Sequence, residues 1–385
     1  MHKLVMALVA AAFSLTAIAD ISFQVKNVES HQRYPWNGKV DIDFEIESSE
    51  PTADFKVTVE CTDNIGNTNL TVRTVKYNDN GISLTEFVLK PGKHRLTWDA
   101  DVDAPNVKLP KVSLAVFASV IGVIDTAEYL VIDLSGGSDA ASYPVTTMTG
   151  APSGGWTDEY KTTKLVMRHC PKGTDPLGRY TLTQDFYAGV FEVTEKQWCL
   201  VMGGSTSRET YPKASVSYNT IRGTSLGANW PSSSAVDTTS FIGKLRNKTG
   251  LSALDLPTEA QWEFACRAGT TTTYNTGDSE YSLAGAGWYS GNAGGSTHPV
   301  GQKVANSWGL YDMHGNVWEW CLDWDGASLT GNNPVGAASG SYRYTRGGSY
   351  SFDADYAPSS YRYYYSMYPS RAYDFLGFRL FRTIP

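Results

Sequence analysis

The chain has 385 residues, which is long enough for two domains that each bury a hydrophobic core. Its 39 acidic and 32 basic residues give a formal net charge of −7 at pH 7, and lysine and arginine form no cluster in the sequence. This charge pattern predicts that the chain binds neither nucleic acid nor an anionic membrane surface. Nothing in the composition indicates an oligomeric state.

The first 19 residues have the pattern of a secretory signal peptide. Lys3 supplies positive charge, residues 4–18 are mostly apolar, and Ala17–Ala19 has the small-x-small form of a cleavage site. No second apolar run is long enough to span a membrane. The sequence therefore predicts a mature chain that begins at Asp20, is secreted, periplasmic or displayed at the cell surface, and has no membrane insertion.

Residues 20–134 predict an immunoglobulin-like β-sandwich. Apolar and acidic residues alternate over 40–47, and apolar and polar residues alternate over 55–60. Asn-Gly and Pro-Gly pairs separate such runs, and about seven or eight short strands fit the segment, as in a sandwich of this type. Residues 135–160 are rich in Gly, Ser, Thr and Ala without periodicity, which predicts a linker.

Residues 161–385 predict a second, loop-rich α+β domain of short elements. Thr194 with Gln197, and Thr258 with Gln261, form two capping boxes, each of which marks the start of a short helix. A third helix is expected to end at Gly250. The many glycines and tryptophans in the remainder of the domain are typical of a domain with few long regular elements.

Residues 350–376 have an unusual composition. Of these 27 residues, eight are Tyr, five Ser, three Asp, three Ala and two Phe, without the periodicity of a buried strand or an amphipathic helix. Tyrosine offers a large contact area with few rotatable bonds, and Ser and Asp add adaptable polar contacts, as in antibody combining sites. We interpret the stretch as a set of surface loops that binds a ligand. The predicted binding residues are Asp353, Asp355, Tyr356, Tyr361, Arg362, Tyr363, Tyr364, Tyr365, Tyr368, Arg371, Tyr373 and Asp374.

Two alternatives to this interpretation remain open. Arg362 and Arg371 could form buried ion pairs instead of contacting a ligand. The whole tyrosine-rich run could also pack against the surface of its own domain and bind nothing. The predicted ligand, if the surface is a binding site, is an extracellular protein or a glycan.

Six sequence blocks in the second domain occur in a recognisable order and spacing. They are FYAGVFEVTEKQW (186–198), LPTEAQWEFACRAGT (256–270), PVG (299–301), NSWGLYDMHGNVWEW (306–320), RGGSY (346–350) and GFR (377–379). Together they resemble the formylglycine-generating enzyme, or sulfatase-modifying factor, family. The resemblance implies a compact domain related to C-type lectins and an oxidase that converts a sulfatase cysteine to formylglycine, with copper held by two cysteines.

The positions that correspond to those two cysteines are Phe352 and Ala357, and no cysteine follows Cys321. Monovalent copper requires soft thiolate ligands, which neither residue supplies. The sequence thus predicts that copper is not bound and that the chain is not an enzyme. The alternative is a formylglycine-generating oxidase with another ligand set, or a degenerate homologue of one. Cys266 and Cys321 could form a disulfide or lie as small buried hydrophobic residues.

The resemblance also implies a structural calcium site. Its ligands would be the side chains of Asp312 and Glu319 and the main-chain carbonyls of Gly315 and Val317. Hard oxygen ligands in a tight, glycine-containing loop are what calcium prefers. In the alternative, Asp312 caps backbone amides and Glu319 forms an ion pair.

The tyrosine-rich stretch is also similar to the variable regions of some targets of diversity-generating retroelements. Asn codons that end in C or T, randomised at their adenines, yield Tyr, Ser, Asp, Ala and Phe among others, and these five types make up 21 of the 27 residues. Some of these target proteins use the lectin-related fold and end their variable segment near a GFR-like anchor. The resemblance implies a binding surface that differs between sibling sequences.

Overall fold

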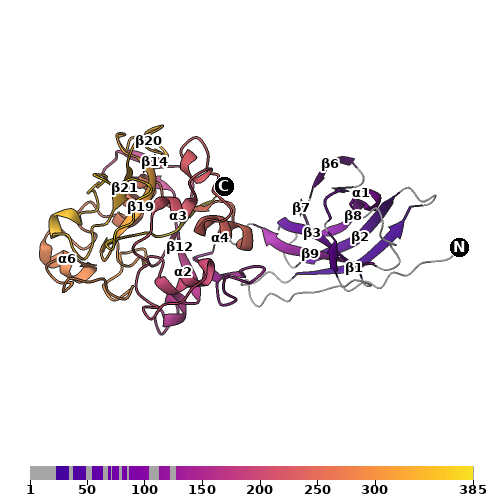
Figure 1. The fold of residues 1–385 in the computed structure, drawn as a ribbon, viewed down its shortest axis with the longest axis horizontal. Coiled ribbons are helices and arrows are strands. Elements are labelled where there is room, and N and C mark those ends of the chain that lie inside the picture. The colour runs from indigo at the N-terminus through magenta and orange to yellow at the C-terminus, as the bar shows by residue number, and fades with distance from the viewer. Residues whose placement is uncertain are drawn as a thin grey trace. The chain divides into compact units, whose positions relative to one another are not determined.

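The computed structural model describes residues 23–33, 38–48, 54–63, 68–70, 72–77, 80–84, 86–103, 112–121 and 127–384 (Figure 1). The chain forms two compact units, Met1–Thr126 and Ala127–Pro385. The predicted signal peptide lies outside the described residues. In the described part of the chain, no helix combines the length and hydrophobicity needed to cross a bilayer.

The first unit contains two antiparallel sheets. One has the strand order β1-β2-β8-β5-β6, and the other consists of β4-β3-β7 with β9 paired to β3. Its elements are β1 (Phe23–Gln32), β2 (Lys39–Ser48), β3 (Asp54–Asp63), β4 (Thr68–Leu70), β5 (Val75–Tyr77), β6 (Asn80–Leu84), β7 (Glu86–Leu89), β8 (Gly92–Asp99), α1 (Ala100–Asp103) and β9 (Val112–Ile121).

One hydrophobic cluster joins the two sheets of this unit. The alternate apolar residues of β2 are buried, as the sequence pattern predicts. Val40 and Trp98 from one sheet belong to the same buried cluster as Phe55 and Val57 of β3 and Leu114 of β9. Each sheet thus buries one face against the other, which is the arrangement of a β-sandwich.

The second unit is built on a six-stranded sheet in the order β11-β10-β12-β15-β23-β16, with smaller sheets β13-β14-β20, β17-β18 and β21-β19-β22. Its strands are β10 (Tyr129–Asp133), β11 (Val145–Met148), β12 (Lys164–Cys170), β13 (Gly173–Thr174), β14 (Tyr180–Leu182), β15 (Phe186–Gly189), β16 (Leu254–Asp255), β17 (Gly287–Trp288), β18 (His314–Gly315), β19 (Trp318–Trp324), β20 (Gly331–Asn332), β21 (Arg343–Arg346), β22 (Leu376–Gly377) and β23 (Phe381–Thr383).

The helices of the second unit are short. They are η2 (Asp158–Lys161), α2 (Glu195–Met202), α3 (Tyr218–Arg222), η3 (Gly227–Asn229), α4 (Phe241–Thr249), α5 (Glu259–Arg267), α6 (Glu280–Ala286) and η4 (Ala354–Tyr356). The two predicted capping boxes are present at the starts of α2 and α5, and α4 ends at Gly250 in the left-handed conformation. These three helix boundaries confirm the sequence prediction.

The boundary predicted between the domains is wrong by several residues. The sequence assigns residues 129–134 to the first domain and 135–160 to a linker. Instead, β10 pairs with β12 and with β11, so both β10 and β11 belong to the sheet of the second unit. The ring of Trp156 also lies 5.1 Å from the rings of Tyr129 and Tyr160. Residues 135–160 are therefore part of the second unit, although their composition resembles that of a linker.

Candidate ligand-binding surface

Residues 350–376 connect β21 to β22 and contain the single turn η4 between irregular segments. This confirms the predicted set of loops. Two glycines start the stretch: Gly347 and Gly348 have φ values of +100° and +79°. A Cβ atom at Gly348 would lie 3.1 Å from the Cα atom of Ala357, so a side chain here would crowd Ala357 in addition to straining the backbone at positive φ.

Helix α5 supplies two fully buried carboxylates that hold the beginning of the stretch in place. The guanidinium of Arg346 pairs with Glu259 at 3.1 Å and donates a hydrogen bond to Glu263. It also donates to the carbonyl oxygens of Ser359 and Tyr361, at 2.9 and 2.7 Å. Because these bonds are buried, they fix the backbone around residues 359–361.

Arg362 lies inside the stretch and is a second anchor. Its guanidinium donates to both carboxylate oxygens of Glu259, at 2.6 and 2.5 Å, and to the carbonyl of Ala327 at 2.7 Å. The same group lies 4.2 Å from the centre of the Tyr344 ring. The sequence left Arg362 open between ligand contact and ion pair, and the structure places it in the ion pair.

Main-chain hydrogen bonds tie the middle of the stretch to β21. Thr345 and Tyr363 exchange two bonds of 2.7 and 3.1 Å, and the amide of Arg343 donates to the carbonyl of Met367 at 3.0 Å. The side chain of Met367 is 2% exposed. The segment between Tyr363 and Met367 is thus held at both ends.

Five aromatic side chains form a packed group that we call the inner aromatic cluster. Its members are Trp318, Phe352, Tyr356, Tyr361 and Tyr363. The indole of Trp318 is completely buried, and the ring of Tyr363 stacks on it with a centroid distance of 5.1 Å and an interplanar angle of 24°. Phe352 contacts Trp318, Tyr356 and Tyr363 at 5.3 to 5.8 Å. Of the predicted binding residues, Tyr356, Tyr361 and Tyr363 therefore serve partly as a supporting layer.

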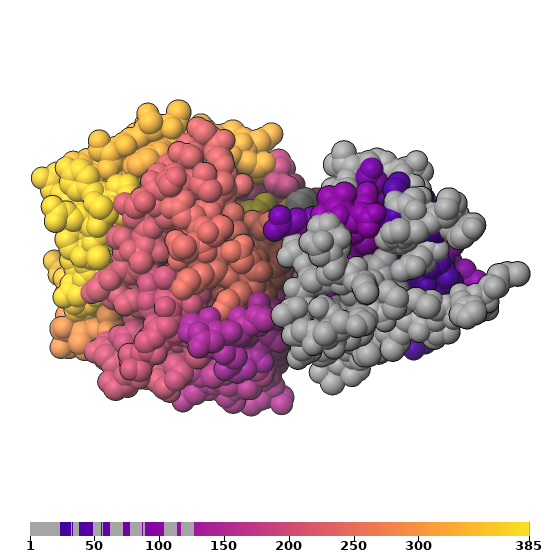
Figure 2. Space-filling view, turned by 45° about the vertical axis from the view of Figure 1, so that its right-hand side comes forward, coloured from indigo at the N-terminus to yellow at the C-terminus, as the bar shows by residue number. Residues whose placement is uncertain are grey.

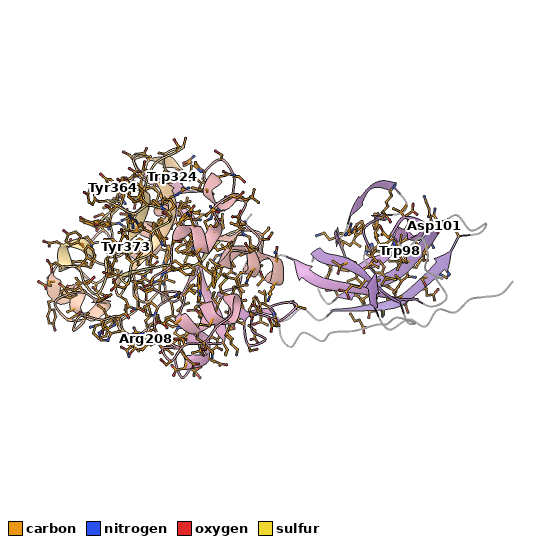
Figure 3. All side chains as sticks on the ribbon, viewed as in Figure 1. Trp98, Asp101, Arg208, Trp324, Tyr364 and Tyr373 are labelled. Atoms are coloured by element: carbon orange, nitrogen blue, oxygen red, sulfur yellow. The ribbon has the colours of Figure 1, made fainter. Side chains whose placement is uncertain are left out.

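Three other tyrosines, which we call the outer tyrosines, face solvent. Tyr364, Tyr365 and Tyr368 have exposed fractions of 43%, 70% and 42%. In Figure 2 the last residues of the chain, in yellow, lie at the molecular surface, and Figure 3 labels Tyr364. The ring of Tyr342 lies 4.7 Å from that of Tyr368, and their hydroxyls are 3.2 Å apart.

The predicted polar residues lie at other positions of the same stretch. Asp353 accepts a hydrogen bond of 2.6 Å from the hydroxyl of Ser290. Asp374 is exposed and is hydrogen-bonded to the hydroxyl of Tyr350. The pKa of Tyr350 is raised, mainly by burial and then by the charge of Asp374. Asp355 and Arg371 are exposed as well, and Tyr373, labelled in Figure 3, stacks on Phe375 at 5.0 Å.

Sequence reasoning missed four contributors to this surface. Tyr342 and Tyr344 lie on or beside β21, before the stretch that drew attention, and Trp318 and Ser290 come from distant segments. The alternation Tyr342-Arg343-Tyr344 was a usable signal, since in a strand it places both tyrosines on one side. Nothing local in the sequence points to Ser290.

The positions predicted to replace the family's catalytic cysteines contain no sulfur and are packed. Phe352 belongs to the inner aromatic cluster, and Ala357 is 1% exposed, with its carbonyl 2.8 Å from Nδ1 of the buried His314. Cys266 and Cys321 are buried free thiols, so the alternative of two small core residues holds. Burial raises the pKa of Cys266 to about 12, which makes this thiol a poor nucleophile.

The predicted calcium ligands lie among buried charges. Oδ2 of Asp312 accepts a bond of 2.6 Å from the amide of Gly301, while its Oδ1 is buried and has no hydrogen-bond partner. Both oxygens of Glu319 accept bonds of 2.8 to 3.0 Å from Arg379, and Oε2 also accepts one from Trp262. Asp312 therefore fits a cation ligand, whereas Glu319 would have to be shared with Arg379. Among the described residues, no three His, Cys, Asp or Glu side chains are grouped to hold a metal by themselves.

Asp323 of β19 is a further buried carboxyl group. Its Oδ2 accepts a bond of 2.8 Å from the amide of Glu259. Burial, and then the charge of Glu259, raise its pKa from 3.8 to about 8. A carboxyl whose pKa is raised by folding stabilises the fold at low pH, and this contribution is lost as the pH rises from about 4 to 8.

We expect Asp323→Asn to become increasingly favourable relative to the wild type over that pH range. Asparagine cannot ionise, so the variant avoids the loss that the wild type suffers. The difference in unfolding free energy should grow between pH 4 and pH 8 by at least about 1.4 kcal/mol, the equivalent of one pKa unit. Urea denaturation at both pH values measures it, and an offset that does not change with pH would contradict the expectation.

Comparisons with known proteins agree with the sequence blocks. The family described as sulfatase-modifying factor enzyme 1-like domain matches residues 139–384. The chain belongs to the sulfatase-modifying factor family. This match begins before the predicted domain boundary and includes β11, in agreement with the extent of the second unit. The resemblance to formylglycine-generating enzymes is confirmed.

Individual relatives show how far the similarity extends. Chaperone protein LppX of Paenibacillus barcinonensis is 32% identical over 215 residues, which are 46% of this chain and 73% of that protein. The formylglycine-generating enzyme of Mycobacterium tuberculosis is 49% identical over 82 residues, or 17% of this chain and 25% of the enzyme. That of Thermomonospora curvata is 35% identical over 127 residues, or 25% of this chain and 38% of the enzyme. The chain thus spans well under half the length of these two enzymes.

Among solved structures, the chain is similar to Treponema denticola variable protein 1. It is 27% identical, with a TM-score of 0.45, and the match covers 58% of this chain and 96% of that chain.

Proposed function

We propose that this sulfatase-modifying factor domain is a ligand-binding module and that the outer tyrosines, with Tyr342, are the centre of its contact surface. The observation that carries the proposal is the exposure of Tyr364, Tyr365 and Tyr368 on a segment anchored at both ends. Aromatic side chains are normally buried, and a group of them at the surface marks an interaction site. Asp353, Asp355, Asp374 and Arg371 provide polar contacts at its edge.

The anchoring of the segment favours binding energetically. A flexible loop loses conformational freedom when it binds, and this loss lowers the affinity. Here the bridge between Thr345 and Tyr363, the ion pair of Arg362 and the buried Met367 hold the loop before any ligand arrives. The inner aromatic cluster supports the same loop from below. Little further ordering is needed on binding, which is the design of a pre-organised combining site.

The partner of this surface is an extracellular protein or a glycan. The protein is secreted, periplasmic or displayed at the cell surface, and its first unit is an immunoglobulin-like sandwich that serves as a spacer. The Tyr, Ser, Asp, Ala and Phe content of residues 350–376 supports diversification by a retroelement. Sibling sequences that differ at the outer tyrosines and agree at Arg346 and Gly347 would support that origin.

Replacing the outer tyrosines together by alanine should weaken ligand binding by at least about 100-fold, as expected for aromatic anchors at the centre of an interface. The melting temperature should change by less than about 2 °C, because exposed side chains contribute little to stability. Binding to a glycan array and to a displayed random peptide library measures the first effect. Tyr77→Ala is the control, since Tyr77 is an exposed tyrosine of the first unit. Unchanged binding by the triple variant would reject the proposal.

A structural calcium ion is a second part of the proposal. The buried guanidinium of Arg379 is hydrogen-bonded to Glu319, and two further buried carboxyl groups, Glu192 and Asp312, lie within its electrostatic reach. Calcium bound by Asp312, Glu319 and the carbonyls of Gly315 and Val317 would neutralise part of the remaining charge. The unpartnered Oδ1 of Asp312 favours this assignment.

The calcium proposal predicts a higher melting temperature in millimolar calcium than in EDTA. A ligand present at 100 times its dissociation constant stabilises the fold by about 2.7 kcal/mol. Asp312→Asn should reduce the calcium-dependent part of the shift, whereas the exposed Asp158→Asn should leave it unchanged. Equal melting temperatures of the wild type in calcium and EDTA would contradict the proposal.

A further inference from the structure

We infer that the partner of the outer tyrosines is a protein that presents lysine or arginine side chains. This inference rests on the proposed binding function and adds the chemistry of the ligand. It is drawn from three observations: the carboxylates in and beside the tyrosine-rich stretch, the pairing of nearby arginines inside the domain, and the exposure of the outer tyrosines.

Carboxylates occur at several places in and beside the tyrosine-rich stretch. Asp325 accepts a bond of 3.3 Å from the amide of Tyr342, and it raises the pKa of the Tyr342 hydroxyl after the larger effect of Tyr368. Asp353 is the N-cap residue of η4 and Asp355 lies within it, and Asp374, near the end of the stretch, is hydrogen-bonded to Tyr350. The pKa of the Tyr274 hydroxyl is raised by burial and then by the charges of Asp355 and Glu280, the first residue of α6. These two carboxylates are therefore near the same hydroxyl.

The cations near this surface are largely neutralised within the domain. Arg362 is paired with Glu259 through two hydrogen bonds. Arg208 lies 3.3 Å from Glu195 and donates to Thr297. Within residues 350–376, Arg371 is the one other basic residue. The surface therefore presents an excess of negative charge, and a cationic partner is complementary to it.

The aromatic faces favour the same kind of partner. A guanidinium or ammonium group over a tyrosine ring gains about 0.5–2 kcal/mol. The domain already uses this contact internally: Arg362 lies 4.2 Å from the Tyr344 ring centre, Arg343 lies 4.6 Å from that of Tyr218, and Lys303 lies 3.9 Å from that of Trp288. The half-exposed ring of Tyr364 and the more exposed ring of Tyr365 offer equivalent faces to a partner. Anionic glycans would meet like charge here.

The shape of the surface indicates a macromolecule. A cavity of about 300 Å³ in the second unit lies elsewhere, between Trp230, Arg246 and Phe381, and none of the predicted binding residues lines it. A small ligand normally requires a concave site that encloses most of its surface. Protruding tyrosines instead suit an extended protein face, where Tyr and Arg are the usual anchors.

The test is selection of a displayed random peptide library on the full chain, followed by binding kinetics of the recovered peptides. We expect recovery that depends on the outer tyrosines, with Lys and Arg at least twofold enriched over the starting library. The variant Asp353→Asn/Asp355→Asn/Asp374→Asn should lower the association rate of these peptides about tenfold at low salt and reduce its salt dependence. The matched control Asp139→Asn/Asp158→Asn/Glu159→Gln removes three exposed carboxylates far along the chain and should change neither.

The outcomes separate this inference from the proposed function. Peptides that need the outer tyrosines but show no Lys or Arg enrichment would overturn the inference and leave the binding function standing. Equal rate losses in the two charge variants would also overturn it, because attraction by the overall negative charge would then suffice. If no peptide is recovered through the outer tyrosines, the inference fails, and glycan-array binding then decides whether the surface binds a ligand at all.

Discussion

Glu259→Gln should lower the free energy of unfolding by about 3–5 kcal/mol, the cost of removing one partner from a buried ion pair. Glu259 is fully buried and pairs with two arginines, Arg346 at 3.1 Å and Arg362 at 2.6 and 2.5 Å. Without its charge, Arg346 keeps only Glu263 as a charged partner, and Arg362 loses its anchor. Urea denaturation of the full chain measures the effect, when the unfolding of the second unit is the transition that is followed.

The matched control is Glu209→Gln. Glu209 forms an ion pair of 2.7 Å with Lys196, but both side chains are partly exposed, and such a pair contributes about 0–1 kcal/mol. A loss at Glu259 no larger than that at Glu209 would mean that the carboxylate of α5 does not hold the tyrosine-rich stretch. Glu259→Gln should also weaken ligand binding, because the ion pair with Glu259 holds Arg362, which positions the backbone next to Tyr363.

Tyr363→Ala should cost about 2–3 kcal/mol, somewhat less than the 3–5 kcal/mol typical of a fully buried large aromatic residue. Its ring stacks on the buried Trp318 at 5.1 Å and contacts Phe352 at 5.8 Å. Tyr365→Ala should change stability by no more than about 0.5 kcal/mol, since its side chain is 70% exposed. Denaturation of both variants tests this contrast, and a similar effect at the two positions would contradict the assignment of Tyr363 to the inner aromatic cluster.

This contrast shows what sequence reasoning could and could not resolve. From the sequence, residues 363–365 form one run of three tyrosines that are all predicted to bind the ligand. In the structure, Tyr363 packs inward while Tyr364 and Tyr365 face solvent. The path of the loop depends on Arg346, Glu259 and Trp318, which lie up to about a hundred residues away in the sequence. No local pattern encodes contacts of this kind.

Other features were accessible because their causes are local or because whole blocks match a family. The capping boxes predicted the starts of α2 and α5, and the alternation over residues 40–47 predicted the buried face of β2. The six blocks identified the family. By contrast, β10 and β11 were missed as parts of the second unit. The apolar run of β10 predicts a strand but not the sheet that it joins, and β11, in a segment rich in small and polar residues, is defined by its partner β10 rather than by its own sequence.

The residues of the tyrosine-rich stretch that fall outside its five common types are Pro358, Arg362, Met367, Pro369, Arg371 and Leu376. Three of them hold the loop: Arg362 is ion-paired, and Met367 and Leu376 are at most 2% exposed. These three residues and the inner aromatic cluster hold the loop, whereas the outer tyrosines are displayed. Outward-facing positions such as 364, 365 and 368 can exchange their side chains without disturbing the contacts that shape the loop, so one scaffold can carry a repertoire of surfaces with different specificities.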